Sequence, residues 1–240
     1  NVTITSGSAI QASAFENCTT LSSVTLPNSL VSIGNKAFYG CTNLNGLNIP
    51  SNVTSIGANA FYNCTSISTI VLPDSISSLD STAFTGCSNI KSVSLSAMFI
   101  SLIPKANLQE IIITSGQSIP ERAFYNCSQL TKVVLPKSIT DIGNNAFYGC
   151  TSLSYLEWNA NECISAGSKT YPIFANCSNL STIMFGNDVT TIPAYAFYGC
   201  NAISSLKIPK NVINIGTDAF VGCANLANIE VESQNNVYAA

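Results

Sequence analysis

A phenylalanine followed three residues later by a cysteine recurs nine times along this chain. The cysteines of these units are Cys18, Cys41, Cys64, Cys87, Cys127, Cys150, Cys177, Cys200 and Cys223, and most neighbours in that series are 23 residues apart. A unit of this length cannot bury its own apolar face, so consecutive units must stack on one another to form a common core. The period therefore predicts a repeat solenoid.

Each repeat also carries a short strand pattern, in which Leu or Ile is followed after two residues by two apolar residues in alternation. In the second repeat Val24 and Leu26 point one way and Ser23 and Thr25 the other, as strand pleating requires. Copies of the pattern begin at Leu21, Leu44, Ile67, Ile90, Leu108, Leu130, Leu153, Leu180, Ile203 and Leu226. We expect about 10 coils, mostly of 23 residues, with one strand of a parallel sheet in each.

Two segments break the period. Residues 90–108 form a short coil without the Phe-x-x-Cys unit, which we interpret as a pinched coil that shifts the curvature. An insertion at about 159–173 contains Cys163, the one cysteine out of step, and is expected to form a loop on the side of the stack, where insertions are tolerated. Neither segment reads as a linker, so residues 1–240 are predicted to be a single domain.

Composition excludes several classes of function. The chain has 9 Lys plus Arg against 12 Asp plus Glu, a net charge of −3, which argues against nucleic-acid binding. It has no histidine, no Cys-x-x-Cys pair and no opposed carboxylates, so we expect neither an enzyme nor a metal or other cofactor. Its most apolar stretch, residues 97–103, is far shorter than the roughly 18 residues of a transmembrane segment.

The repeat unit resembles a known family. Leu21–Leu44 and Leu130–Leu153 both read Leu-x-x-Val-x-Leu-Pro, then an aliphatic residue-x-x-Ile-Gly, then Ala-Phe-Tyr-Gly-Cys-Thr-x-Leu. This pattern is similar to the BspA-like, or Treponema-type, leucine-rich repeat. The resemblance implies an α/β repeat solenoid: a curved, right-handed superhelix with a parallel sheet on the concave side and short strands, turns and 3-10 segments on the convex side.

The resemblance also implies a biological setting. Members are secreted or cell-surface proteins of host-associated bacteria and some parasitic protists, and they are associated with adhesion to host proteins or other cells. The tail, Ile229–Tyr238, resembles the end of a repeat run in such proteins, which suggests a fragment of a longer surface protein.

The cysteines have two interpretations. Stacking at the repeat period places nine sulfurs in one column at roughly the 4.8 Å strand spacing. Neighbours at that spacing are close enough for a disulfide, but nine in register cannot all pair. We predict free thiols that act as small core residues, with disulfides as the alternative.

Three further repeated residues also have a functional and a packing interpretation. The tyrosine after Ala-Phe, at Tyr39, Tyr62, Tyr125, Tyr148 and Tyr198, forms either an aromatic contact surface or a flank on which each ring covers its neighbour. Asn17, Asn63, Asn126 and Asn176 match the N-glycosylation pattern, which chance recurrence within the repeat explains. Gly34, Gly57, Gly143 and Gly216 are read as backbone turns.

The outward strand positions change character along the chain and locate a candidate binding site. They are small or bland in the first half and become apolar or charged later, at Ile112, Lys132, Val134, Tyr155, Glu157 and Met184. We predict that these six residues form a patch that binds a protein or glycan on a host or microbial surface. Two alternatives stay open: the apolar residues merely stabilise the sheet across strands, and the solenoid is a stalk that presents another domain.

Overall fold

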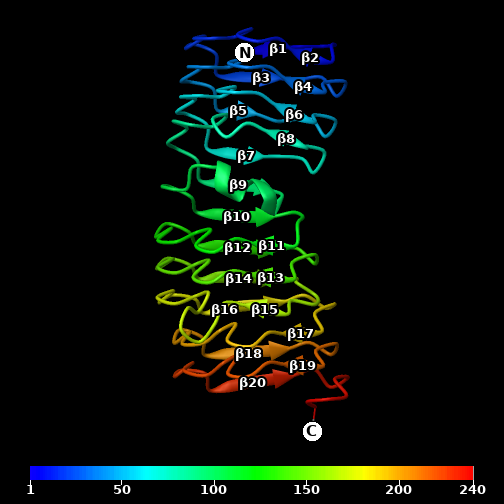
Figure 1. Ribbon diagram of the computed structural model, residues 1–240, viewed down its shortest axis with the longest axis vertical. Helices are drawn as coiled ribbons and strands as arrows, with labels where there is room; N and C mark the ends of the chain where they lie inside the picture. Colours follow the sequence, from blue (N-terminus) through cyan, green and yellow to red (C-terminus); the bar gives the residue numbers. More distant parts are fainter. Residues whose placement is uncertain (240) are drawn as a thin grey trace. The chain divides into compact units, whose positions relative to one another are not determined.

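The computed structural model describes residues 1–239, which form two compact units, Asn1–Leu108 (unit 1) and Gln109 onward (unit 2). Both are built from short parallel strands, and the described residues contain no α-helix. Figure 1 shows the coils of each unit following one another as labelled strands. The boundary falls at the end of the irregular coil 90–108, and the single-domain interpretation stays a prediction.

Unit 1 contains nine strands and one 3-10 helix. The strands are β1 (Val2–Thr3), β2 (Ala9–Ile10), β3 (Ser23–Thr25), β4 (Ser32–Ile33), β5 (Gly46–Leu47), β6 (Ser55–Ile56), β7 (Thr69–Val71), β8 (Ser78–Leu79) and β9 (Ser92–Leu95). Odd-numbered strands pair as β1-β3-β5 and β7-β9, and even-numbered strands as β2-β4-β6-β8, all parallel. Each coil from β1 to β8 therefore has two strands, one in each kind of sheet.

Unit 2 continues the same two-strand coil. Its strands are β10 (Glu110–Ile113), β11 (Ser118–Ile119), β12 (Lys132–Leu135), β13 (Asp141–Ile142), β14 (Tyr155–Trp158), β15 (Ser165–Ala166), β16 (Thr182–Phe185), β17 (Thr191–Ile192), β18 (Ser205–Ile208), β19 (Asn214–Ile215) and β20 (Asn228–Val231). They pair as β10-β12-β14-β16, β18-β20, β11-β13-β15 and β17-β19. The predicted stack of parallel coils, a β-solenoid, is confirmed in each unit.

The two irregular segments take different forms. In unit 1, the 3-10 helix η1 (Ala97–Leu102) stands where other coils have their second strand, and it buries Phe99 and Ile100. In unit 2, much of the insertion belongs to the stack: β15 pairs with β13, and Cys163 is fully buried. Only the following turn, closed by backbone hydrogen bonds between Ser168 and Tyr171, leaves the coil. The predicted side loop is therefore shorter than the insertion.

A column of stacked phenylalanines forms the core of each unit. In unit 1, the ring centroids of Phe38 lie 5.1 Å from Phe15 and 5.3 Å from Phe61, nearly parallel to both. Beside this column runs the predicted column of cysteines, all free and, except for Cys18, buried. In six coils the thiol donates a hydrogen bond to the backbone carbonyl of the phenylalanine in the preceding coil. These thiols belong to Cys41, Cys64, Cys87, Cys150, Cys177 and Cys223. A small side chain that can also donate is thus preferred over alanine or valine.

The recurring glycines open turns, as predicted, and they also lie where successive coils approach closely. Gly143 does not have a positive φ; its N–H donates to the carbonyl of Ile119 at 2.9 Å, which draws two coils together. A Cβ at this position would overlap the backbone of Glu121 in the preceding coil. Gly143 also opens a turn, since the Ala146 N–H donates to its carbonyl at 3.2 Å, but it is the close approach of two backbones that excludes a side chain.

We expect Gly143→Ala to lower the free energy of unfolding by about 2–3 kcal/mol, because the coils must separate to admit a methyl group. The matched variant is Gly199→Ala, where φ is +75° and nothing lies within 4 Å of the added Cβ. It should cost about 1 kcal/mol from backbone strain alone. Chemical denaturation measures both, and an equal or larger loss in Gly199→Ala would contradict the close-approach argument.

Candidate binding surface

The outward side of β10, β12, β14 and β16 carries two rows of side chains, fixed by strand register. Glu110, Lys132, Tyr155 and Thr182 form the first row, and Ile112, Val134, Glu157 and Met184 form the second. Inward positions between them, such as Val133 and Leu156, are fully buried. All six predicted site residues therefore lie on one face of unit 2, which we call the strand face.

The apolar members of the predicted patch are not contiguous. Glu157 stands in the second row between Val134 and Met184, and Tyr155 lies in the first row beside Lys132. Ile112, Val134 and Tyr155 are half-buried, whereas the Met184 side chain is 51% exposed. Glu157 thus interrupts the apolar side chains of the second row, and Tyr155 stands apart from them in the first.

Charged groups of the strand face already have partners within unit 2. The Lys132 ammonium lies 2.8 Å from Glu110 and 6.0 Å from the centre of the Tyr155 ring. The hydrogen bond to Glu110 raises the pKa of Lys132 above its ordinary value. Asn159 donates to the Glu157 carboxylate at 2.9 Å. These contacts hold the side chains in place before any partner arrives.

Three shallow hollows adjoin the C-terminal half of the predicted site. One of about 330 Å³ is lined by Tyr155, Glu157 and Met184. Two more hollows are both lined by Met184 and Lys207. The one of about 180 Å³ extends to Glu232, and the one of about 240 Å³ extends to Glu230. Ile112, Lys132 and Val134 line none of the three. The structure thus adds Lys207, Glu230 and Glu232 to the candidate surface.

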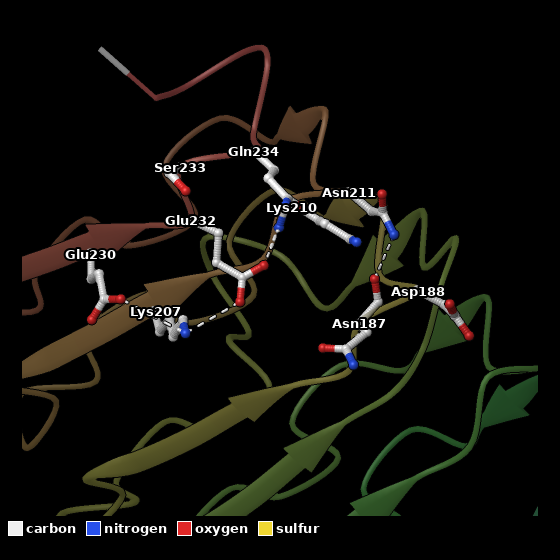
Figure 2. A pocket seen from close by; sticks show the side chains of 9 residues that line it. All are labelled: Asn187, Asp188, Lys207, Lys210, Asn211, Glu230, Glu232, Ser233 and Gln234. Atoms are coloured by element: carbon white, nitrogen blue, oxygen red, sulfur yellow. Dashed lines mark hydrogen bonds and ion pairs between the residues drawn. The ribbon is translucent and has the colours of Figure 1, made fainter.

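A larger polar hollow of about 630 Å³ lies at the ends of β16, β18 and β20. Figure 2 shows Lys207 reaching Glu230 and Glu232, with N–O separations of 3.7 and 3.2 Å. The Lys210 backbone N–H donates to Glu232 at 2.9 Å, and this bond is the main reason that the pKa of Glu232 is lowered. Asn211 donates its side-chain amide to the Asn187 carbonyl at 2.7 Å. The hollow offers amides, carboxylates and ammonium groups for hydrogen bonding.

Sequence reasoning missed Glu230 and Glu232, although the signal was present. β20 pairs with β18 in register, so Lys207 faces Glu230 just as Val134 faces Glu157 one sheet earlier. Extending the alternation of outward positions by one more strand identifies Glu230. Glu232 follows the strand end and becomes part of the surface only through the turn that brings it to Lys210.

The tyrosine flank is packed as a stack in both units. Tyr39 and Tyr62 are 4.9 Å apart, and Tyr125 and Tyr148 are 4.8 Å apart, each pair nearly parallel. Arg122 lies 5.6 Å from the Tyr125 ring. Each ring covers its neighbour, which is the arrangement that the packing interpretation requires.

The asparagines of the glycosylation pattern also have a backbone role. Asn17, Asn63, Asn126 and Asn176 all have φ between 56° and 61° and are exposed. The left-handed conformation favours asparagine and glycine. Their repeat position holds glycine in the coils between them, at Gly40, Gly86 and Gly149, and the preceding asparagine side chain leans over each of these glycines. Backbone conformation thus explains why asparagine recurs at this position.

Within residues 1–239 no group of three or more His, Cys, Asp or Glu side chains is arranged to hold a metal ion. The helix η1 has six residues, and no helix of the described part is long and apolar enough to cross a membrane. The strand face carries apolar, amide and charged groups.

A family model for the BspA type leucine rich repeat region matches residues 8–108 and 101–227. Among solved structures, a leucine rich repeat protein of T. pallidum is 23% identical, with 94% of this chain and 78% of that chain covered and a TM-score of 0.39. A leucine rich cell surface protein of Faecalibacterium prausnitzii is 21% identical over 99% and 90%, with a TM-score of 0.34. The pneumococcal vaccine antigen PcpA is 25% identical over 90% and 52%, with a TM-score of 0.40. Comparison with curated proteins finds no match.

Proposed function

The chain belongs to the BspA-type leucine-rich repeat family, and on that premise we propose that it is a binding module. It acts outside the cell, secreted or on the cell surface, and recognises a protein or glycan of a host or microbial surface. Contact is made through the strand face of unit 2. The chain performs no catalysis in this role.

The observation that carries this proposal is the exposed Met184 at the centre of contiguous hollows. Its side chain is 51% exposed although it lies within a sheet, and the hollows on either side of it extend to Tyr155 and to Lys207. An exposed apolar side chain surrounded by aromatic and charged groups is the usual composition of a protein-binding hot spot.

A spacer function is the second candidate. The half-burial of Ile112 and Val134 and the internal ion pair of Lys132 with Glu110 favour it. Side chains that satisfy one another across strands stabilise the sheet without a ligand. The two functions differ in whether substitutions on the strand face affect adhesion without affecting folding.

We expect the double variant Tyr155→Ser, Met184→Ser to reduce adhesion of the parent protein about tenfold, because it removes the apolar groups of the surface. The control pair is Thr25→Ser, Asn48→Ser, at exposed positions of unit 1, in β3 and directly after β5. Adhesion to immobilised host matrix proteins and glycans is measured on variants shown to be folded by circular dichroism. Equal losses in both pairs would favour the spacer.

A further inference from the structure

Strands β16 and β18 lie in consecutive coils but belong to different sheets. β16 pairs with β14, and β18 pairs with β20, whereas every other pair of successive strands on the strand face of unit 2 shares a register. The sheet of the strand face is therefore interrupted at one place, which we call the fissure.

Three other contacts between the same two coils are also relaxed. Phe174 and Phe197 are 5.8 Å apart, while the other consecutive rings of the columns are 5.1 to 5.4 Å apart. Within residues 1–239 the Cys200 thiol makes no hydrogen bond to the preceding coil, in contrast to Cys177 and Cys223. No atom lies within 4 Å of a Cβ built on Gly199, although its equivalents Gly40, Gly86 and Gly149 contact the preceding asparagine. The junction is therefore relaxed around the strand face and the phenylalanine column, whereas β17 and β19 of the same two coils stay paired.

Aromatic side chains inside the coils explain the wider junction. Trp158 and Phe185 are register partners at an inward position where β12 has Leu135 and β18 has Ile208. Both rings pack against Phe197, with centroids 5.5 and 5.8 Å away. Two aromatic rings in succession exceed the volume of the aliphatic residues of other coils, so β18 cannot close on β16.

The core residues beside the fissure are buried but reach a hollow at its surface. Ile183 and Phe185 are 7% and 9% exposed, whereas the equivalent Val133 and Leu135 are fully buried. With Met184 and Pro209 they line the hollow of about 180 Å³. This opening offers an apolar side chain from outside the molecule contact with aliphatic and aromatic carbon.

The rim of the fissure is acidic. The residues that line the three hollows include three carboxylates, Glu157, Glu230 and Glu232, and one ammonium, Lys207, which gives a net charge of −2 (one positive minus three negative). Lys207 is shared between Glu230 and Glu232, and Lys210 also acts on Glu232 through its backbone N–H and its charge, so Glu230 is the less neutralised of the two. A cationic partner complements this rim.

We propose that the fissure binds a segment of a partner protein that carries an aliphatic side chain next to Lys or Arg. The aliphatic group enters between β16 and β18, and the cation lies against Glu230 and Glu232. This inference rests on the proposed function and names the partner class of the same face. The apolar lining favours a peptide over a glycan, whose hydroxyl groups require polar partners.

The test uses short unstructured peptides and the fluorescence of Trp158, the single tryptophan of the chain. The first probe is a peptide of Leu-Lys pairs separated by Gly. In the second probe Glu replaces each Lys, and in the third Ser replaces each Leu. We expect only the Leu and Lys peptide to change the fluorescence saturably, with at least about tenfold weaker binding for the others. Its affinity should fall with added salt.

Two matched pairs of variants locate the site. Met184→Ser should weaken binding of the Leu and Lys peptide about tenfold, and Met98→Ser, at the only other methionine, should leave it unchanged. Glu230→Gln should weaken it about threefold. Its control is Glu121→Gln, an exposed carboxylate with a similarly loose partner at 3.6 Å. Equal binding of the acidic and basic peptides, or equal effects within either pair, would overturn the proposal.

The outcome also separates this inference from the proposed function. If the Tyr155 and Met184 substitutions abolish adhesion but no peptide binds, or only neutral glycans bind, the fissure proposal is wrong and the binding module stands. If the basic peptide binds the fissure and adhesion is unaffected, the fissure proposal stands and the adhesion role is wrong.

Discussion

Replacing Phe61 by alanine lowers the free energy of unfolding by about 3–5 kcal/mol, as expected for removal of a fully buried aromatic ring. The Phe61 side chain is inaccessible to solvent and lies between Phe38 at 5.3 Å and Phe84 at 5.2 Å. Its loss leaves both neighbouring rings facing a cavity that no other side chain fills. Because each coil contacts only its neighbours, the damage is concentrated at one level of unit 1.

The adjacent Tyr62→Ala is the control for this prediction. Tyr62 is half-buried on the flank and stacks on Tyr39 at 4.9 Å, so its removal should cost about 1 kcal/mol. Thermal and chemical denaturation of both variants give the comparison. Equal losses would mean that the two side chains contribute equally to the core, and the assigned register would be wrong.

Most of the fold is predictable because a solenoid converts sequence spacing into spatial contact. Residues one period apart become neighbours, so Ile10, Ile33 and Ile56 are predicted to touch from the sequence and are register partners in the structure. The phenylalanine and cysteine columns follow in the same way. No long-range pairing has to be guessed, which is the step at which sequence reasoning about other β folds fails.

The candidate site is less predictable because it depends on register along each strand. The alternation of strand residues correctly places Val134, Tyr155 and Glu157 on the outward side. The alternation alone does not show which of the two outward residues of β14 lies opposite Val134. In the structure this residue is Glu157. Counting the 23 residues from Val134 to Glu157 would have given that row and separated Tyr155 from the apolar residues.

The fissure could not be predicted, because it depends on distances between coils and not on the period. Trp158 and Phe185 both match the apolar pattern, and only their combined volume against Phe197 separates β16 from β18. The hydrogen bonds from the thiols to the phenylalanine carbonyls are hidden for a similar reason. The sequence shows that a small residue recurs, but the geometry shows that it donates.

The thiols of the folded protein should react with a thiol reagent far more slowly than those of the denatured protein. Cys18 is exposed and is expected to react at an ordinary rate, whereas the other nine are buried. Burial raises the pKa of Cys41 to about 11 and the pKa values of Cys87 and Cys163 to about 12, from an ordinary 9.0. A rise of three units in the pKa of a thiol lowers its thiolate population at neutral pH about a thousandfold. The thiolate is the reactive form.

The same pKa values predict how stability depends on pH. Below about pH 9 the thiols are protonated in both the folded and the unfolded chain, so their contribution does not change. Above it the unfolded chain loses protons that the buried thiols retain, and each such thiol lowers the free energy of unfolding by up to about 1.4 kcal/mol per pH unit until its folded pKa is reached. Denaturation midpoints should therefore be constant from neutral pH to about pH 9 and fall above it.

Titration of the unreduced protein with a thiol reagent tests the free-thiol column directly. In denaturant all ten cysteines should react, and in the folded state one should react rapidly. Cys18→Ser should remove that rapid phase and leave the denatured count lower by one. If two cysteines or fewer react in denaturant, the column is bridged by disulfides, and the hydrogen bonds from thiol to carbonyl cannot be what holds successive coils together.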